Sequence, residues 1–163
     1  MPSKEACEDL YLKHAPAAFR RALRMLGNAA DADDVVHDVF LALFEDYARF
    51  RGGSSVSTYL YSAVTHACLN RLRNQRKRRD LVAERFVEAR FDPGQSAEAS
   101  AMLRDLLARV PEPLCEVLVY HYLDELSQRE IASLLGCSHT HVGALLARLA
   151  HWSAEEEVSP CRT

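Results

Sequence analysis

The sequence has no apolar run approaching the ~20 residues that a membrane span requires. Its first ten residues, MPSKEACEDL, lack the apolar segment of a secretion signal. The five cysteines are scattered and form no C-x-x-C pair, which is typical of reduced thiols. We therefore expect a cytoplasmic chain without membrane insertion.

Motifs for catalysis and cofactor binding are also missing. The chain has no P-loop, no G-x-G-x-x-G, no H-E-x-x-H and no G-x-S-x-G sequence. Cys137, His139 and His141 lie close together, but their spacing is not a standard zinc pattern. Cys137 is therefore interpreted as a small packed residue. We predict that the chain is not an enzyme and holds no metal and no cofactor.

Glycine and proline are scarce, at six residues each, and 48% of the 163 residues are hydrophobic, which excludes a disordered chain. Apolar residues recur at three- and four-residue steps in successive segments, the pattern of amphipathic helices. We predict an all-α fold of two small helical domains joined by a short linker. The predicted boundaries are domains at 1–79 and 96–153, a linker at 80–95 and an acidic tail at 154–163.

Local signals predict where the first two helices begin and end. Pro16 interrupts the pattern of residues 5–26 and predicts a kink or a break. Gly27 and Asn28 are typical of a helix C-terminus. Asp31 is the predicted N-cap of a second helix that extends to about Tyr47.

No Asp or Glu occurs between Asp46 and Asp80, although the chain holds 23 acidic and 20 basic residues. This span begins with a Gly-Ser loop at 51–55 and continues as a helix that ends in a basic run at 71–79. Tyr59 offers an aromatic ring near its start. Cations and aromatic rings suit a single nucleic-acid strand, and we favour this interpretation over a solvated helix end.

The predicted second helix carries acidic residues opposite its apolar side, among them Asp34 and Asp38. From charge alone a solvated polar face is the favoured interpretation, and a docking surface for a basic protein is the alternative.

The C-terminal part has the pattern of a helix-turn-helix. Ser127 and Glu130 can form a capping box, Gly136 provides a turn, and Ser138 can cap a last helix. Ordinary helical hairpins share much of this pattern.

Two blocks of the sequence resemble a known family. The run Asp31–Phe40, followed by FRG at 50–52 and STYLY at 57–61, resembles the promoter-melting domain of bacterial sigma factors. The run LSQREIA at 126–132, with LGCS at 135–138, resembles their C-terminal helix-turn-helix. A chain with only these two blocks is similar to the extracytoplasmic-function group.

The resemblance implies a sigma factor whose partners are core RNA polymerase, promoter DNA and an anti-sigma factor. The resemblance implies that the acidic face of the second helix binds the polymerase. The docking surface therefore replaces the solvated face as the favoured interpretation. The implied polymerase contacts are Asp34, Asp38 and Leu41. The implied contacts to the non-template strand of the proximal promoter element are Ser54, Ser55, Tyr59, Asn70, Arg71, Arg73, Asn74, Arg76 and Lys77.

The last helix departs from the family pattern, because Arg148 is the only Lys or Arg between Thr140 and Trp152. The implied contacts to the distal promoter element are Ser138, His139, Thr140, His141, Gly143 and Arg148. Few cations mean few phosphate contacts, so we hypothesise that this domain alone binds duplex DNA weakly. A stand-alone helix-turn-helix regulator and a sigma-like interaction module that does not initiate transcription are the alternatives.

Overall fold

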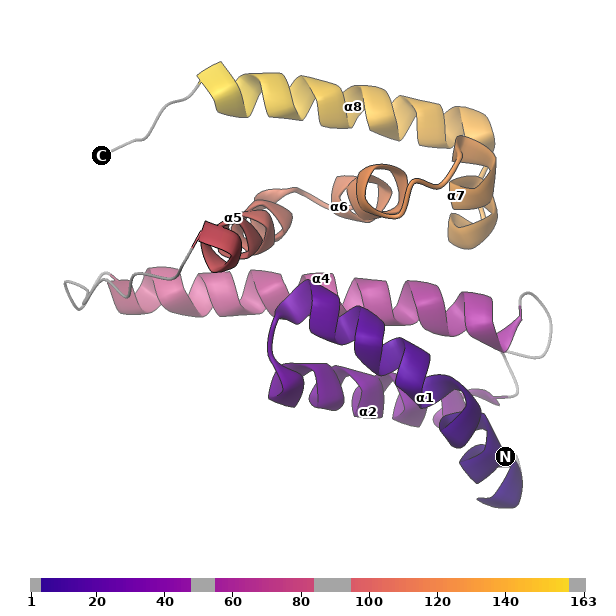
Figure 1. Ribbon diagram of the computed structural model, residues 1–163. Helices are drawn as coiled ribbons and strands as arrows, with labels where there is room; N and C mark the ends of the chain where they lie inside the picture. Colours follow the sequence, from indigo (N-terminus) through magenta and orange to yellow (C-terminus); the bar gives the residue numbers. More distant parts are fainter. Residues whose placement is uncertain (1–3, 48–54, 84–94, 159–163) are drawn as a thin grey trace. The chain divides into compact units, whose positions relative to one another are not determined.

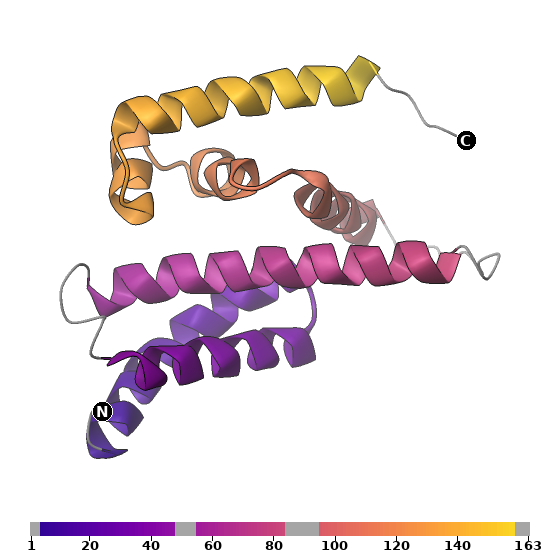
Figure 2. The ribbon, with the colours of Figure 1, turned by 180° about the vertical axis from the view of Figure 1, so that it is seen from behind.

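The computed structural model describes residues 4–47, 55–83 and 95–158, and all regular elements in these ranges are helices (Figures 1 and 2). This confirms the predicted all-α fold. The helices are α1 (Lys4–Leu26), α2 (Ala29–Glu45), α4 (Val56–Ala83), α5 (Gln95–Arg109), α6 (Leu114–Leu118), the π-helix η1 (Val119–Leu123), α7 (Gln128–Leu135) and α8 (His139–Val158). None of the described helices combines the length and apolar character needed to cross a bilayer.

The chain divides into two compact units, Met1–Arg109 and Val110–Thr163. Helix α5 falls in the first unit, where it packs on α4. The domain boundaries predicted from the sequence instead place residues 96–109 in the second domain. These predicted boundaries stay a prediction.

The core of the first unit lies where α1, α2 and α4 meet (Figure 1). Each helix places small or branched apolar residues on its inner face at helical spacing. Fully burying a side chain as large as Phe40 or Leu69 contributes ~1.5–3 kcal/mol. Apolar residues of these three helices that are almost fully buried include Ala22, Ala32, Val36, Phe40, Leu43, Val64, Cys68 and Leu69.

Helix α1 continues through Pro16, so of the predicted kink or break the break is wrong and the kink stays a prediction. Proline removes the N–H that would bond the carbonyl of Leu12, one turn earlier. Leu12 is 73% exposed, so water can reach that carbonyl. The loss is therefore tolerated at this position.

The N-cap of α2 is Asn28, and the prediction that Asp31 caps this helix is wrong. The Asn28 side chain accepts a hydrogen bond from the backbone N–H of Asp31 at 2.8 Å. Gly27 ends α1 with a φ of 77°, a left-handed conformation that glycine adopts without strain. Asp31 lies in the first turn of α2, which frees its carboxylate for other partners.

That carboxylate joins α2 to α4. Arg71 donates from Nε to Asp31 Oδ1 at 2.9 Å, and Gln75 donates to Oδ2 at 2.7 Å. Hydrogen bonds from Asn28 and then Arg71 hold the pKa of Asp31 below its ordinary 3.8. Asp31, followed by Asp34, raises the pKa of Arg71. The ion pair is thus present at all pH values above the ordinary carboxyl range.

The second unit follows the predicted helix-turn-helix pattern closely. Ser127 and Glu130 form the predicted capping box, in which Glu130 Oε2 accepts from the backbone N–H of Ser127 at 2.8 Å. Gly136 ends α7 with a φ of 64°. Ser138 Oγ accepts from the backbone N–H of His141 at 3.1 Å and so caps α8, as predicted. The buried residues that hold α7 against α8 are Ile131, Ala132, Val142, Leu145 and Leu149.

Two sequence expectations in this unit are corrected. The helix expected over 114–126 ends as an α-helix at Leu118 and continues as the π-helix η1 to Leu123. The residues expected to form a tail after 153 continue α8 to Val158, and residues 153–156 are exposed.

The replacement Ser127→Ala should lower the free energy of unfolding by about 1 kcal/mol, because it removes the N-cap of α7. Chemical denaturation of the full chain measures the change. Ser133→Ala is the matched control, since Ser133 is an exposed residue inside the same helix. Equal effects of the two replacements would contradict a role for the capping box.

The replacement Asp31→Asn should destabilise the first unit by about 1 kcal/mol at neutral pH, a value limited by solvent screening. Because the folded-state pKa of Asp31 is lowered, this stabilisation is present above pH 3.8 and is lost as the pH falls through the folded-state value. Denaturation of both proteins across acidic pH checks this, with exposed Asp33→Asn as the control. A difference that persists at the lowest pH would contradict the ion-pair explanation.

Candidate nucleic-acid interface

Five of the predicted strand-binding residues share one face of α4. Asn70 lies 11 residues after Tyr59, and Lys77 lies 18 residues after Tyr59. Both separations are close to a whole number of helical turns, so the three side chains lie along one line of the helix. Arg73 and Asn74 lie to either side of this line. We call Tyr59, Asn70, Arg73, Asn74 and Lys77 the α4 stripe; Asn74 and Lys77 are exposed and the other three are partly exposed.

Within the stripe, Arg73 and Asn70 are held together. Arg73 Nη1 donates to Asn70 Oδ1 at 2.9 Å. This bond occupies the amide oxygen of Asn70 and directs its NH₂ group away from the arginine. An amide donor beside a guanidinium is an arrangement that can contact a base edge and a phosphate together.

Ser55 has a structural task at the start of α4. Its Oγ accepts from the backbone N–H of Thr58 at 3.1 Å and lies 2.8 Å from Thr58 Oγ1. The side chain is thus the N-cap of α4. Ser54, also a predicted contact, lies outside the described residues.

Arg71 and Arg76 lie off the stripe and face carboxylates. Arg71 Nη2 lies 2.8 Å from Asp34 Oδ2, in addition to its bonds to Asp31. Arg76 Nε lies 3.6 Å from Asp80, and its Nη1 lies 3.9 Å from Asp105 of α5. Both side chains are about one-third exposed, although Arg76 Nη1 itself is buried.

The predicted polymerase contacts form a second surface, on α2. Asp34, Asp38 and Leu41 follow one another at four- and three-residue steps, so they share one exposed face. Leu41 is 46% exposed, an apolar residue flanked by acidic ones. The Asp34 carboxylate at one end of this face is the one that Arg71 contacts.

Sequence reasoning missed cations on α1. Arg20, Arg21 and Arg24 lie together on α1 and line a cavity against α4. The signal was present, because three arginines at adjacent helical positions stand out in a chain of net charge −3. It was overlooked because the basic run of α4 carries more charge. His66 is a further exposed residue on the line of the α4 stripe.

On the second unit, His139, Thr140, His141 and Arg148 are exposed on α8. Gly143 is partly covered, because a Cβ there would lie 3.5 Å from Gln128 Oε1 of α7. In the described part of the chain, no three His, Cys, Asp or Glu side chains come together in a way that could hold a metal ion.

Comparison with protein families finds two matches. The sigma-70 region 2 model matches residues 10–78, and the sigma-70 region 4 model matches residues 100–149. The first match contains α2 and the α4 stripe, and the second contains the helix-turn-helix.

Relatives and solved structures agree with these matches. The sigma factor YlaC of Bacillus subtilis is 28% identical over 91% of this chain and 90% of its own. The sigma factor CarQ of Myxococcus xanthus is 29% identical over 83% and 80%. The chain is similar to CnrH, solved in complex with the cytosolic domain of CnrY, with a TM-score of 0.55 and 25% identity over 97% and 92% of the two chains.

A sigma factor bound to the anti-sigma factor NepR, from Bartonella quintana, shares the fold with a TM-score of 0.50 and 16% identity over 88% of this chain and 91% of its own. Several of the curated relatives are ECF sigma factors, among them SigW of Bacillus subtilis, 25% identical over 81% of this chain and 78% of its own. Because both sigma regions are matched in the order that the sequence suggested, the chain belongs to the extracytoplasmic-function group of the sigma-70 family, the RNA polymerase subunits that recognise promoters and start transcription.

Proposed function

We propose that the α4 stripe captures the non-template strand of the proximal promoter element while the acidic face of α2 holds core RNA polymerase. The observation that carries this proposal is the separation of two chemically opposite surfaces on one compact unit. The stripe presents amides, cations and an aromatic ring on α4. The α2 face presents Asp34 and Asp38 beside exposed Leu41.

The stripe suits a separated strand better than a duplex. Tyr59 offers a ring on which an unstacked base can lie, at ~1–3 kcal/mol per stacked base. Arg73 and Lys77 can neutralise phosphates, and Asn70 and Asn74 carry amides able to contact base edges. Extruding a base costs a few kcal/mol, which contacts of this kind can offset.

The α2 face suits a basic protein surface. An exposed leucine flanked by carboxylates gives an apolar contact with a charged rim, the usual composition of a protein interface. The charged rim accelerates encounter with a partner of opposite sign, and the apolar contact stabilises the complex.

Arg71 and Ser55 take positioning roles within this proposal. Arg71 ties α4 to Asp31 and Asp34 of α2, so it orients the two surfaces rather than binding phosphate. Ser55 caps α4 and so holds the first turn, which places Tyr59. Arg76, with Asp80 and Asp105 nearby, contributes less to DNA than Arg73 or Lys77.

The second unit recognises the distal element with few phosphate contacts. Residues 110–163 hold three arginines, no lysine and eight acidic residues. Affinity and its salt dependence both scale with the number of neutralised phosphates. Binding by this unit therefore depends on its tether to a polymerase-bound first unit, which raises its effective concentration at the promoter.

The site of action is the cytoplasm, where core polymerase and reduced thiols occur together. Two solved structures of similar fold are complexes, of CnrH with the cytosolic domain of CnrY and of a sigma factor with the anti-sigma factor NepR. By analogy, an anti-sigma factor regulates this chain as well.

The combined replacement of Arg73, Asn74 and Lys77 by Ala should lower promoter opening about 100-fold or more. Each lost charged hydrogen bond is worth ~1.5 kcal/mol, roughly tenfold. Permanganate reactivity of unpaired thymines, in a promoter found by transcription from a promoter library, measures the effect. Arg79→Ala is the control, because Arg79 is an exposed cation on the side of α4 opposite the stripe. Normal opening by the triple variant would refute strand capture by this face.

Replacing Asp38 by Lys should weaken binding to core polymerase at least tenfold, because it opposes a cation to a basic surface. Titration of labelled chain with core enzyme gives the affinity. Asp33→Lys makes the same charge change on exposed α2 surface away from Leu41 and should have a much smaller effect. If both variants bind equally well, the α2 face does not dock on the polymerase.

A further inference from the structure

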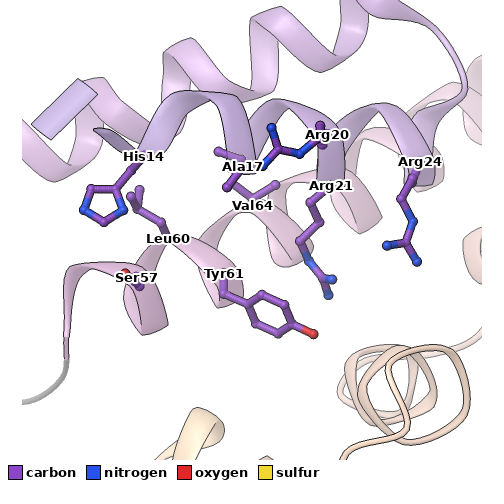
Figure 3. Close-up of a pocket in the computed structure, with 10 residues that line it drawn as sticks. His14, Ala17, Arg20, Arg21, Arg24, Ser57, Leu60, Tyr61 and Val64 are labelled. Atoms are coloured by element: carbon purple, nitrogen blue, oxygen red, sulfur yellow. The ribbon is translucent and has the colours of Figure 1, made fainter. Parts of the chain in front are cut away.

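A cleft of about 430 Å³ lies between α1 and the first turns of α4, within the first unit. Its floor is formed by Leu60 and Val64, which are buried. Arg20, Arg21 and Arg24 project from α1 along its edge, and Tyr61 projects from α4 (Figure 3). A volume of this size is within the range of small-ligand sites, ~300–1,000 Å³.

The cleft is lined by positively charged residues and by no acidic residue. The positively charged residues are the three arginines of α1. Three guanidinium groups at one edge repel one another, so an anion that lies among them is strongly favoured. The forked shape of guanidinium suits the oxygens of a phosphate in particular.

Arg21 is held in place before any ligand arrives. Its Nε donates to Thr65 Oγ1 at 2.8 Å, and its guanidinium carbon lies 3.8 Å from the centre of the Tyr61 ring. Thr65 is fully buried and donates in turn to the carbonyl of Tyr61 at 2.7 Å. This chain of contacts fixes one wall of the cleft, which lowers the entropic cost of binding.

Arg20 and Arg24 are the groups available to a ligand. Both are exposed, and among the described residues neither is paired with a carboxylate. They lie four residues apart on α1, so their side chains emerge on the same side of the helix, one turn apart. Figure 3 shows Arg24 pointing from α1 toward α4, while the Arg20 side chain runs back along α1 toward Ala17.

The cleft opens at the end of α4 where strand capture is proposed. Ser57, another lining residue, lies between the cap Ser55 and the stripe residue Tyr59. Ser57 and Tyr59 are two positions apart, which is about 200° around a helix, so the cleft and the start of the stripe lie on nearly opposite sides of the first turn of α4. A strand that wraps around this end of α4 would meet both.

We propose that this cleft binds the phosphate backbone of the opened DNA strand through Arg20 and Arg24, where the strand passes around the start of α4 beyond the nucleotide captured by the α4 stripe. The proposal rests on the proposed function and extends it, because it adds α1 to the strand-binding surface. A free nucleotide offers the same phosphate chemistry and is distinguished by the experiment below.

The test measures binding of a labelled twelve-nucleotide oligothymidylate to the full chain assembled on core RNA polymerase, as a function of KCl, with core enzyme alone as background. Each phosphate contact to a single strand contributes about 0.7 to the slope of log affinity against log salt. The double variant Arg20→Ala, Arg24→Ala should lower that slope by about 0.7 if the arginines share one phosphate and about 1.4 if they bind two. The variant Arg20→Lys, Arg24→Lys keeps both charges and should retain the slope.

Arg129→Ala is the matched control, because it removes an exposed arginine of α7 that lines no part of this cleft, and its slope should equal that of the unmodified chain. An unchanged slope in the Arg20, Arg24 alanine variant would overturn the proposal. It would also be overturned if that variant lost affinity for core polymerase instead, which would make the cleft a protein contact. Binding of free thymidine monophosphate that disappears in the variant, with strand binding unchanged, would assign the cleft to a nucleotide and refute the strand contact.

A further variant separates this proposal from the strand capture on which it rests. Replacement of Asn74 and Lys77 by Ala should reduce oligothymidylate binding if the α4 stripe holds the strand. If the Asn74, Lys77 variant binds oligothymidylate more weakly and the Arg20, Arg24 variant binds it normally, the proposed function stands and only the α1 contact is refuted. If the Asn74, Lys77 variant binds oligothymidylate normally, the proposed function itself is refuted.

Discussion

The ion pair between Asp31 and Arg71 joins the first turn of α2 to the middle of α4 across 40 positions of the sequence. Everything proposed for the first unit depends on the relative orientation of these two helices. The apolar residues between them favour close packing, but packing of small branched side chains alone tolerates rotation and sliding. A charged hydrogen-bonded link, supported by Asn28 and Gln75, specifies one register. Arg71 also reaches Asp34, so the link ends at the acidic face itself.

The different sides of helix α4 serve core packing, the exposed stripe and the cationic cleft. One side buries Val64, Cys68 and Leu69 in the core. Burial raises the pKa of the Cys68 thiol to about 12, so this cysteine stays protonated and serves only in packing. A second side carries the exposed stripe, and the first turns line the cationic cleft beside α1. The second unit has the opposite electrostatic character, with acidic residues in excess. The cations proposed to bind nucleic acid are therefore concentrated in the unit that matches sigma-70 region 2.

The sequence predicted those features whose cause is local. Helical periodicity located the elements, and the Ser127–Glu130 box, Gly136 and the Ser138 cap were confirmed because each depends on residues within one turn of itself. Features that depend on distant residues were missed. The contacts of Arg71 and Gln75 with the Asp31 carboxylate had no local signal. The Asn28 cap is a local feature, and it was missed because Asn28 was assigned to the end of the preceding helix. The cationic cleft needs α1 and α4 brought together, and the continuation of α6 as a π-helix has no distinctive residue signal.

In the proposed function, one compact unit holds polymerase on α2 and the non-template strand on α4. Site-specific photocrosslinking in an open promoter complex tests it most directly, with the crosslinking residue placed at position 38 or at position 74 and each DNA strand labelled separately. Position 74 should crosslink to the non-template strand and position 38 to the largest polymerase subunit. Crosslinking of position 74 to protein or to the template strand, or of position 38 to DNA, would contradict it.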